Sequence, residues 1–323
     1  MPRRKKEFNK SIFETIRKYN GNASDVSIRT YTANIEKLIR DLKGDTSSPN
    51  ASLFENYDNI ISLLDSQKLS LNTYKNKLSS IITFLFANGS KKTIVDKFTN
   101  KVDELSGKIE KDNAKMTWND KEKNNIVKIK ELKDYLDIMY TKLSNNPNKY
   151  SEYNKYMMYL SGMFHIHYPL RNEFSDMKVY SKKEYDDIKD IDTNLNYIVL
   201  SKDKGTVILN KYKTKKTYGT IEFNFDEPYL IDAFNKYYDS MKKNIPADKF
   251  NNWLLFKHNY EPFNRNEFTK LMNKTFEATG KNISTSLIRK MVLSELYPVE
   301  KMKKLSGIMG HSVKTAINDY VRD

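Results

Sequence analysis

The chain contains no cysteine among its 323 residues. This absence excludes disulfide bonds, zinc sites built on thiolates and a cysteine nucleophile, and it fits an intracellular protein. Glycine is scarce, at 10 residues, and no glycine-rich phosphate loop occurs, so we expect no nucleotide site. No apolar run approaches the ~18 residues of a membrane span, and the first residues lack the apolar core of a secretory signal. The sequence therefore predicts a protein without membrane or nucleotide partners.

Histidine is also rare, with four in the chain. His165 and His167 stand two apart in a predicted helix, where their side chains point in different directions. No acidic or cysteine cluster completes a set of metal ligands around them. His258 is expected at a loop tip. We therefore predict no metal site.

Positive charge is what the sequence has in excess. Lys and Arg total 56 against 41 Asp and Glu, which gives a formal net charge of +15. This surplus favours a polyanionic partner, above all nucleic acid, although a basic protein without such a partner stays an alternative. The basic segment Pro2–Lys6 fits a nuclear address, a DNA-contacting arm or a solvated tail equally well.

Residues 1–110 are predicted to form a helical domain. Apolar residues recur at helical spacing in four segments, and polar breaks separate them. Four amphipathic helices of this length predict a small bundle with lysines on its outer faces. The segments cover residues 30–42, 60–64, 78–86 and 92–105.

Residues 111–121 are polar, show no periodic apolar face and are predicted to be a linker. Residues 122–323 then form a second domain, which begins and ends with helices. Three strand-like segments lie between these helices, and a basic loop, 211–219, precedes the third. The expected fold class is therefore mainly α with a small antiparallel β-sheet (α+β). The predicted strands cover residues 196–200, 206–209 and 220–223.

A guanidinium, an imidazole and a phenol follow one another near the end of the chain. Arg289 lies in a predicted helix, because apolar residues around it recur at helical spacing. The segment 310–312 predicts a helix stop and a new N-cap around His311. Tyr320 stands nine residues further on. These groups suit attack on a phosphodiester, with the phenol as nucleophile and the two donors stabilising charge on the phosphorane oxygens.

This stretch resembles the C-terminal signature of the tyrosine recombinases (phage-type integrases), which runs His-x-x-Arg, Leu-Gly-His and then Tyr. Here it stands as Ser286-x-x-Arg289, Met309-Gly310-His311 and Tyr320. The interval of 22 residues from Arg289 to His311 is also the family's. Ser286 departs from the usual histidine. A serine can donate a hydrogen bond to phosphate but cannot act as an acid or base near neutrality.

Segments further upstream extend the resemblance. Residues 1–110 are similar to the family's helical core-binding domain. Leu170-Arg171 resembles the motif of its first arginine, whose acid is here Glu173, one position early, or Asp176. Lys213-Thr214 resembles the dipeptide of its catalytic lysine, with Lys215 and Lys216 as open rivals. A mobile ammonium can protonate the leaving 5′ oxygen.

The resemblance implies a site-specific recombinase that cuts and rejoins double-stranded DNA through a 3′-phosphotyrosyl link on Tyr320. Arg171 and Arg289 would bind the non-bridging oxygens, and His311 would donate to them or assist loss of the phenol proton. Lys213 would be the general acid, and Ser286 a neutral donor. No metal or other cofactor is expected, because the arginines supply the positive charge. A type IB-like topoisomerase and a DNA-binding protein without catalysis stay alternatives.

The resemblance also bears on source and assembly. Scarce glycine with abundant lysine, asparagine and tyrosine suits a virus or mobile element, with the host nucleus and a viral factory both open as compartments. A dimer or tetramer on DNA is implied. Only three residues follow Tyr320, whereas many relatives dock a longer segment on the neighbouring subunit. We therefore expect contacts between subunits to use other surfaces.

Overall fold

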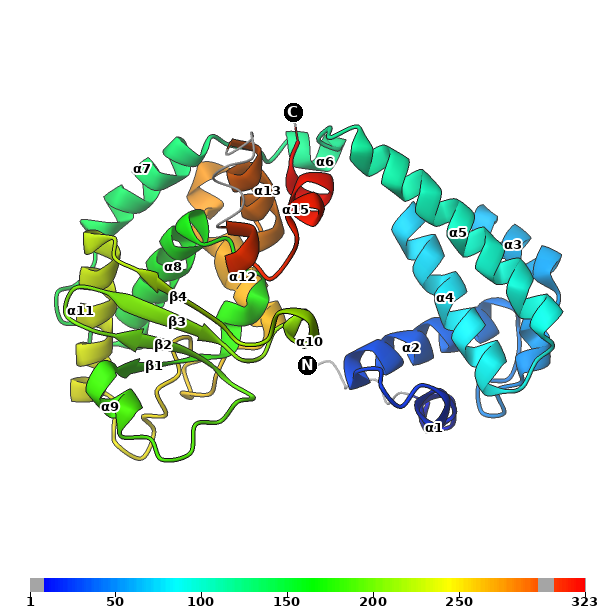
Figure 1. Cartoon of the computed structure of the whole chain (residues 1–323), viewed down its shortest axis with the longest axis horizontal. Helices are drawn as coiled ribbons and strands as arrows, with labels where there is room; N and C mark the ends of the chain where they lie inside the picture. The colour runs from blue at the N-terminus through cyan, green and yellow to red at the C-terminus, as the bar shows by residue number, and fades with distance from the viewer. Residues whose placement is uncertain (1–8, 296–304, 323) are drawn as a thin grey trace. The chain divides into compact units, whose positions relative to one another are not determined.

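The computed structural model describes residues 9–295 and 305–322, so the basic segment Pro2–Lys6 lies outside the described residues. The chain divides into two compact units, and the boundary falls between Lys115 and Met116 (Figure 1). None of the described helices is long and apolar enough to cross a membrane.

From residue 9 on, the first unit contains helices and no strand. The four predicted helical segments correspond to α2–α5, and a further helix, α1, was not assigned, although its buried residues Ile12, Phe13 and Ile16 recur at helical spacing. α4 packs against α1, α2 and α5 and so forms the centre of the bundle. The helices are α1 (Lys10–Tyr19), α2 (Asp25–Asp41), α3 (Tyr57–Ser66), α4 (Leu71–Ala87) and α5 (Lys92–Ala114), with a 3-10 turn, η1 (Ala51–Phe54).

Polar side chains mark where these helices begin. The Ser24 hydroxyl accepts from the backbone N–H of Ser27 at the start of α2, and Ser70 does the same for Thr73 at the start of α4. Each cap satisfies one of the N–H groups that a first helical turn leaves unpaired. Short polar residues therefore set the bounds of helices whose apolar faces the sequence already indicated.

The expected linker differs from the structure at both of its ends. α5 continues to Ala114, and a short helix, α6 (Asp120–Lys123), follows. Residues 111–114 lack an apolar stripe, but the Lys115 ammonium lies 2.8 Å from Asp112 in the last turn. Close pairs of opposite charge, three or four residues apart, support an exposed helix that buries little. Residues 111–114 are therefore helical although they show no apolar period.

Helices of the second unit pack around α8, which is buried along most of its length. α7, α11, α12 and α13 all contact it. Gly162 lets two neighbours approach closely, because a Cβ there would lie 3.0 Å from Leu136 and 3.2 Å from Phe276. These helices are α7 (Ile129–Tyr140), α8 (Tyr150–His167), α11 (Pro228–Asn244), α12 (Arg265–Thr275) and α13 (Thr285–Glu295), with short 3-10 turns η2 (Asn172–Asp176) and η3 (Glu277–Thr279).

One four-stranded sheet lies beside these helices, in the order β1-β2-β3-β4 (Figure 1). The three predicted strands are confirmed and pair antiparallel, with Ile198 opposite Val207 and Val207 opposite Phe223. β1 was missed and pairs parallel with β2, so the sheet is mixed. The strands are β1 (Met177–Ser181), β2 (Asn196–Leu200), β3 (Gly205–Leu209) and β4 (Ile221–Phe225), and α9 (Lys182–Asp186) follows β1 directly.

The basic loop between β3 and β4 has more structure than expected. It contains a helical turn, α10 (Lys215–Tyr218), and the Tyr212 hydroxyl donates to the Gly219 carbonyl across it, at 2.8 Å. At its base the Asn196 side chain accepts from the backbone N–H groups of Asn210 (2.9 Å) and Lys211 (2.8 Å). These bonds give the loop a defined shape.

The last helix is α15 (Val313–Tyr320), which begins at the Ser312 N-cap. Gly310 precedes it with a φ of +64°, a conformation that favours glycine. The predicted helix stop and new N-cap on either side of His311 are confirmed.

Candidate active site

Arg289 is held inside the second unit by backbone carbonyls. It lies on α13 with 3% of its surface exposed. Its Nε donates to the Pro169 carbonyl at 3.0 Å, and its Nη2 donates to Leu170 at 2.7 Å. Burial lowers the pKa of Arg289, and the nearby Tyr320 opposes this shift. Because a guanidinium keeps its proton in proteins, Arg289 is a fixed positive charge in a largely dry site.

Arg171 follows the same two carbonyls in the chain. It lies at the bend between α8 and η2, half-buried, and its Nη1 donates to the Met309 carbonyl at 3.2 Å. On the inner side, the buried ring of His165 lies 3.4 Å from the Arg171 carbonyl through Nε2 and 2.8 Å from the Ser161 carbonyl through Nδ1. Burial lowers the pKa of His165 to about 4, so the neutral ring has one N–H and can donate to only one of these two carbonyls.

His311 is buried, and its ring has no hydrogen-bond partner in the part of the chain that the structure describes. It is 5% exposed, and neither ring nitrogen has a partner within residues 9–295 and 305–322. Burial and the positive charges of Arg171 and Arg289 lower the pKa of His311 to about 3. The ring is therefore neutral at pH 7, with one N–H to donate. A buried polar group without a partner is costly, and an incoming oxygen would relieve that cost.

Tyr320 brings these groups together at the end of α15. The centre of its ring lies 5.2 Å from that of His311. The guanidinium carbon of Arg289 lies 5.1 Å from the same ring. The Tyr320 side chain is half-buried. A phenol, a neutral imidazole and the buried Arg289 guanidinium thus converge from α15, the turn at His311 and α13, and the positive charge of the half-buried Arg171 also acts on His311.

The basic loop packs against the turn that carries His311. The Thr214 hydroxyl donates to the Gly310 carbonyl at 2.6 Å, and a Cβ at Gly310 would lie 2.6 Å from the Tyr212 ring. Only glycine fits this approach. The loop of Lys213 therefore borders the site.

The three candidate lysines of this loop differ in their surroundings. Lys213 is exposed and makes no hydrogen bond or ion pair within the described part of the chain, and Lys216 is exposed as well. The Lys215 ammonium reaches back to the Thr193 carbonyl, at 3.5 Å. The structure brings none of the three ammonium groups into contact with Tyr320.

Ser286 and the two candidate acids lie at different depths. Ser286 is exposed on α13, one turn before Arg289, and its hydroxyl has no hydrogen bond among the described residues. Glu173 is buried at 5% exposure, and its negative charge opposes the effect of burial on the pKa of Arg289. Asp176 instead forms an ion pair with Lys211 at 3.3 Å. Of the two acids, Glu173 is the one whose charge reaches Arg289.

Two residues near the site, Thr214 and His165, are not among the site residues that the sequence predicts. Thr214 appeared only as half of a Lys-Thr dipeptide, yet its hydroxyl joins the loop to the His311 turn. His165 is not among the predicted catalytic residues, yet its Nε2 lies 3.4 Å from the Arg171 carbonyl. His167 points elsewhere, as expected, and its Nδ1 lies 3.2 Å from Glu227. Among the described residues no three His, Asp or Glu side chains gather to hold a metal ion.

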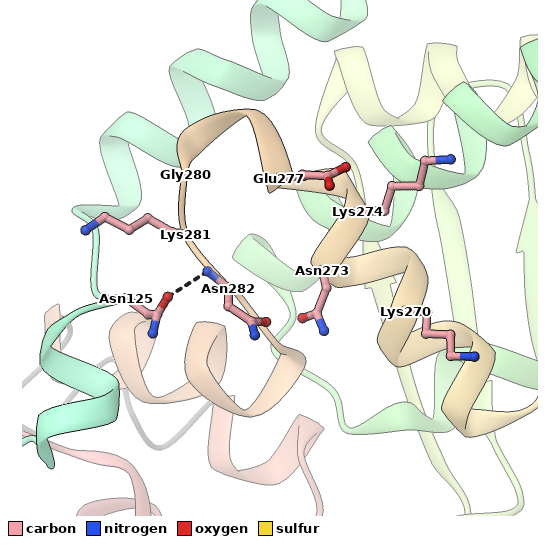
Figure 2. Close-up of a pocket in the computed structure, with 8 residues that line it drawn as sticks. All are labelled: Asn125, Lys270, Asn273, Lys274, Glu277, Gly280, Lys281 and Asn282. Atoms are coloured by element: carbon pink, nitrogen blue, oxygen red, sulfur yellow. Dashed lines mark hydrogen bonds between the residues drawn. The ribbon is translucent and has the colours of Figure 1, made fainter.

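A separate basic hollow lies beside α12. Its lining includes Lys270, Lys274 and Lys281, and Glu277 is the one acid among the described residues that line it. Figure 2 shows the first two on α12 and Lys281 on the segment that follows Gly280, with the Asn125 side chain hydrogen-bonded to Asn282. None of the predicted site residues lines it. The excess of lysine suits an anionic partner.

In fold, the chain is similar to the site-specific tyrosine recombinases. The XerH site-specific recombinase in its pre-cleavage complex with difH substrate has a TM-score of 0.56 at 14% identity, covering 96% of this chain and 81% of XerH. Two further structures score lower. The XerH post-cleavage complex with palindromic difH gives 0.47 at 13% identity, covering 97% of this chain and 91% of that one. XerA recombinase gives 0.40 at 12% identity, covering 97% and 94%.

At such identities the likeness shows the fold alone. No model of a protein family matches the sequence, and no curated protein matches it significantly.

Proposed function

We propose that this protein is a site-specific DNA recombinase that cuts and rejoins DNA through a 3′-phosphotyrosyl intermediate on Tyr320. The observation that carries the proposal is the position of the Tyr320 ring, 5.1 Å from the Arg289 guanidinium carbon and 5.2 Å from the His311 ring. A nucleophile and donors for a phosphate are thereby close together in one chain. The fold shared with XerH supports the same reaction class.

The proposed reaction is a transesterification. The Tyr320 phenol, which is half-buried, loses its proton to solvent water as its oxygen attacks the scissile phosphorus. The bond to the 5′ oxygen breaks, and that oxygen takes a proton from the general acid and leaves as a free 5′ hydroxyl. Arg171 and Arg289 bind the non-bridging oxygens, because planar guanidinium groups match phosphate bidentately. The energy of the broken ester bond is kept in the tyrosyl ester, so rejoining needs no nucleotide. The arginines supply the positive charge that a metal supplies elsewhere.

His311 has two candidate roles, as a donor to the phosphate oxygens and as the base for the phenol. With a pKa of about 3, its ring is a weak base in this arrangement. The neutral ring nevertheless has an N–H that no group among the described residues accepts. We therefore assign His311 as a donor to the phosphate oxygens rather than as the base for the phenol.

Lys213 is proposed as the general acid for the 5′ oxygen. Its ammonium has no competing partner among the described residues, whereas that of Lys215 reaches the Thr193 carbonyl. Glu173 is proposed to support the positive charge of Arg289. Ser286 is proposed as a neutral phosphate donor, for which its exposure on α13 leaves it free.

Double-stranded DNA is the proposed substrate, and XerH has been captured on a DNA substrate in the same fold. The net charge of +15 and the basic hollow beside α12 support binding to a polyanion. Affinity carried by lysine–phosphate contacts falls steeply with salt, because each contact releases condensed counterions. The helical first unit is proposed to share in this binding, with two or four copies acting on one DNA.

A nicked suicide duplex tests the proposal, since a cleaved strand on such a substrate diffuses away and leaves the protein attached. The sequences that flank the gene are the first candidates for the target. We expect a covalent band on a denaturing gel that Tyr320→Phe abolishes. Strand transfer to a second duplex separates a recombinase from a topoisomerase, which relaxes supercoiled plasmid without transfer. Tight, salt-sensitive binding with no band on any substrate would reject the proposal in favour of a DNA-binding protein without catalysis.

A further inference from the structure

Arg322 is a buried charged residue that the proposed chemistry does not use. It is 7% exposed and turns back onto the end of α15. Its Nη1 donates to the carbonyls of Val321 (2.5 Å) and Asn318 (3.4 Å), and its Nη2 donates to Asp319 (3.0 Å). One guanidinium thus serves three carbonyls at the helix end that carries Tyr320.

The Arg322 guanidinium caps the C-terminal end of α15. The last carbonyls of a helix have no partner within the helix and form the negative end of its dipole. A cation placed there is stabilised, and it supplies the missing donors. Burial lowers the pKa of Arg322, while the negative charges of Glu122 and Asp319 oppose that shift. The guanidinium is therefore retained in the interior by acceptors and charges arranged around it.

Ser294 ties the same helix end to α13. Its hydroxyl accepts from the Arg322 backbone N–H at 2.7 Å and donates to the Tyr320 carbonyl at 3.4 Å. Ser294 stands on the helix that also carries Arg289. Val321, which stands between Tyr320 and Arg322 in the chain, is 1% exposed. It packs in an apolar cluster with Leu293 and Met309. Backbone and side chain therefore both fasten the end of α15 to α13.

We propose that Arg322 and Ser294 are positioning residues that hold Tyr320 in place against Arg289 and His311 of the same chain. The inference rests on the proposed role of Tyr320 as the nucleophile. Neither residue touches the reacting atoms. Their effect is to restrict the motion of α15, a helix of eight residues, so that the phenol stays within reach of the phosphate donors.

Arg322→Met tests this assignment with little change in shape, since methionine keeps an apolar stem and loses every donor. Displacing a reacting group by about 1 Å costs on the order of 10²-fold in rate. We expect single-turnover cleavage to fall about 10- to 100-fold while the Kd for DNA stays within about twofold. Arg322→Lys should recover part of the rate, because lysine keeps the charge without the planar fork. Ser294→Ala should also lower the rate.

The matched control is Asn318→Ala, which shortens an exposed side chain of α15 and leaves its carbonyl for Arg322. We expect it to cleave at the wild-type rate. Cleavage by Arg322→Met at the wild-type rate would overturn the proposal. A lower rate that arises wholly from weaker DNA binding would overturn it as well.

A second readout does not depend on cleavage. Because the chain has no cysteine, a spin label on Asn318→Cys reports the motion of α15 alone. We expect the label to gain mobility when Arg322→Met is added, and unchanged mobility would contradict the fastening. If the wild-type protein cleaves no DNA at all, the role of Tyr320 as nucleophile fails, whereas a gain in label mobility still upholds the fastening of α15.

Discussion

The guanidinium carbon of Arg289 lies 5.1 Å from the centre of the Tyr320 ring, although 31 positions separate the two residues in the chain. Two of the guanidinium nitrogens are occupied by the Pro169 and Leu170 carbonyls. The group is thereby fixed in orientation, and its positive charge faces the phenol. This pairing is the basis for assigning Tyr320 as a nucleophile and Arg289 as a phosphate donor.

Arg289→Lys is expected to abolish most cleavage without abolishing DNA binding. Lysine keeps the charge but cannot reach both carbonyls and a phosphate oxygen at once. Loss of one preorganised donor costs on the order of 10²–10³ in rate, and the buried carbonyls left unpaired cost about 1–3 kcal/mol of stability. Single-turnover cleavage and urea unfolding measure the two effects. Arg265→Lys, at an exposed position of α12, is the control. Near-normal cleavage by Arg289→Lys would remove Arg289 from the proposed mechanism.

The buried histidines predict how stability depends on pH. The pKa of His311 falls from the ordinary 6.5 to about 3 on folding. Between these values the unfolded chain binds a proton that the folded protein excludes. Stability is therefore present above about pH 6.5 and is lost as the pH falls toward 3, by about 1.4 kcal/mol per pH unit. His165, with a pKa of about 4, adds a similar loss between pH 6.5 and 4.

Urea unfolding at several pH values between 7 and 4.5 measures this dependence. His311→Gln should reduce the slope by about 1.4 kcal/mol per pH unit and leave the contribution of His165. His258→Gln, at an exposed histidine, is the control. A wild-type slope in His311→Gln would mean that His311 is solvated and does not lie in the dry site described above.

Gly310→Ala is expected to disrupt both the fold and the site. A left-handed conformation costs a non-glycine residue about 1–2 kcal/mol, and the new Cβ would also lie 2.6 Å from the Tyr212 ring. The basic loop must then move off the His311 turn. Gly280→Ala separates the two costs, because Gly280 has a φ of +69° and no atom of the described residues lies within 4 Å of its Cβ position. Thermal unfolding should show a larger loss for Gly310→Ala; equal losses would argue against close packing of the loop.

The general acid can be identified among Lys213, Lys215 and Lys216 by chemical rescue. A substrate with sulfur in place of the leaving 5′ oxygen needs no protonation, because a thiolate is a good leaving group. Lys213→Ala should cleave ordinary DNA about 10²–10⁴-fold more slowly and cleave the sulfur-containing substrate near the wild-type rate. Alanine at the other two positions should change mainly the affinity for DNA. Rescue of Lys215→Ala or Lys216→Ala instead would transfer the role.

Sequence patterns correctly predicted several helices and strands whose ends are marked by local turn or cap residues. The strands at 196–200 and 206–209 show β-branched runs around a turn, and Gly310-His311-Ser312 shows a helix stop and a cap. β1 has five residues, as the other strands do, but it runs directly into the capping box of α9 at Ser181 and Glu184, so no turn residues mark its end. α1 was overlooked, although Ile12, Phe13 and Ile16 show helical spacing. The strand β1 is therefore the element whose bounds local patterns did not reveal.

In the candidate site, too, some features could be predicted from the sequence and others depend on packing. The order and spacing of Arg289, His311 and Tyr320 marked them as a group before any coordinates. The bond from Thr214 to the Gly310 carbonyl joins residues 96 positions apart, and no local pattern encodes such a contact. The burial that shifts the pKa of His311 is also a product of packing.

Mass spectrometry of the covalent protein–DNA adduct tests the central claim most directly. The wild-type protein is trapped on a nicked suicide duplex, and the adduct is digested with nuclease and protease. We predict a nucleotide attached through its 3′ phosphate to the peptide that contains Tyr320, and no adduct from Tyr320→Phe. An adduct on another residue, or one that persists in Tyr320→Phe, would contradict the assignment of Tyr320 as the nucleophile.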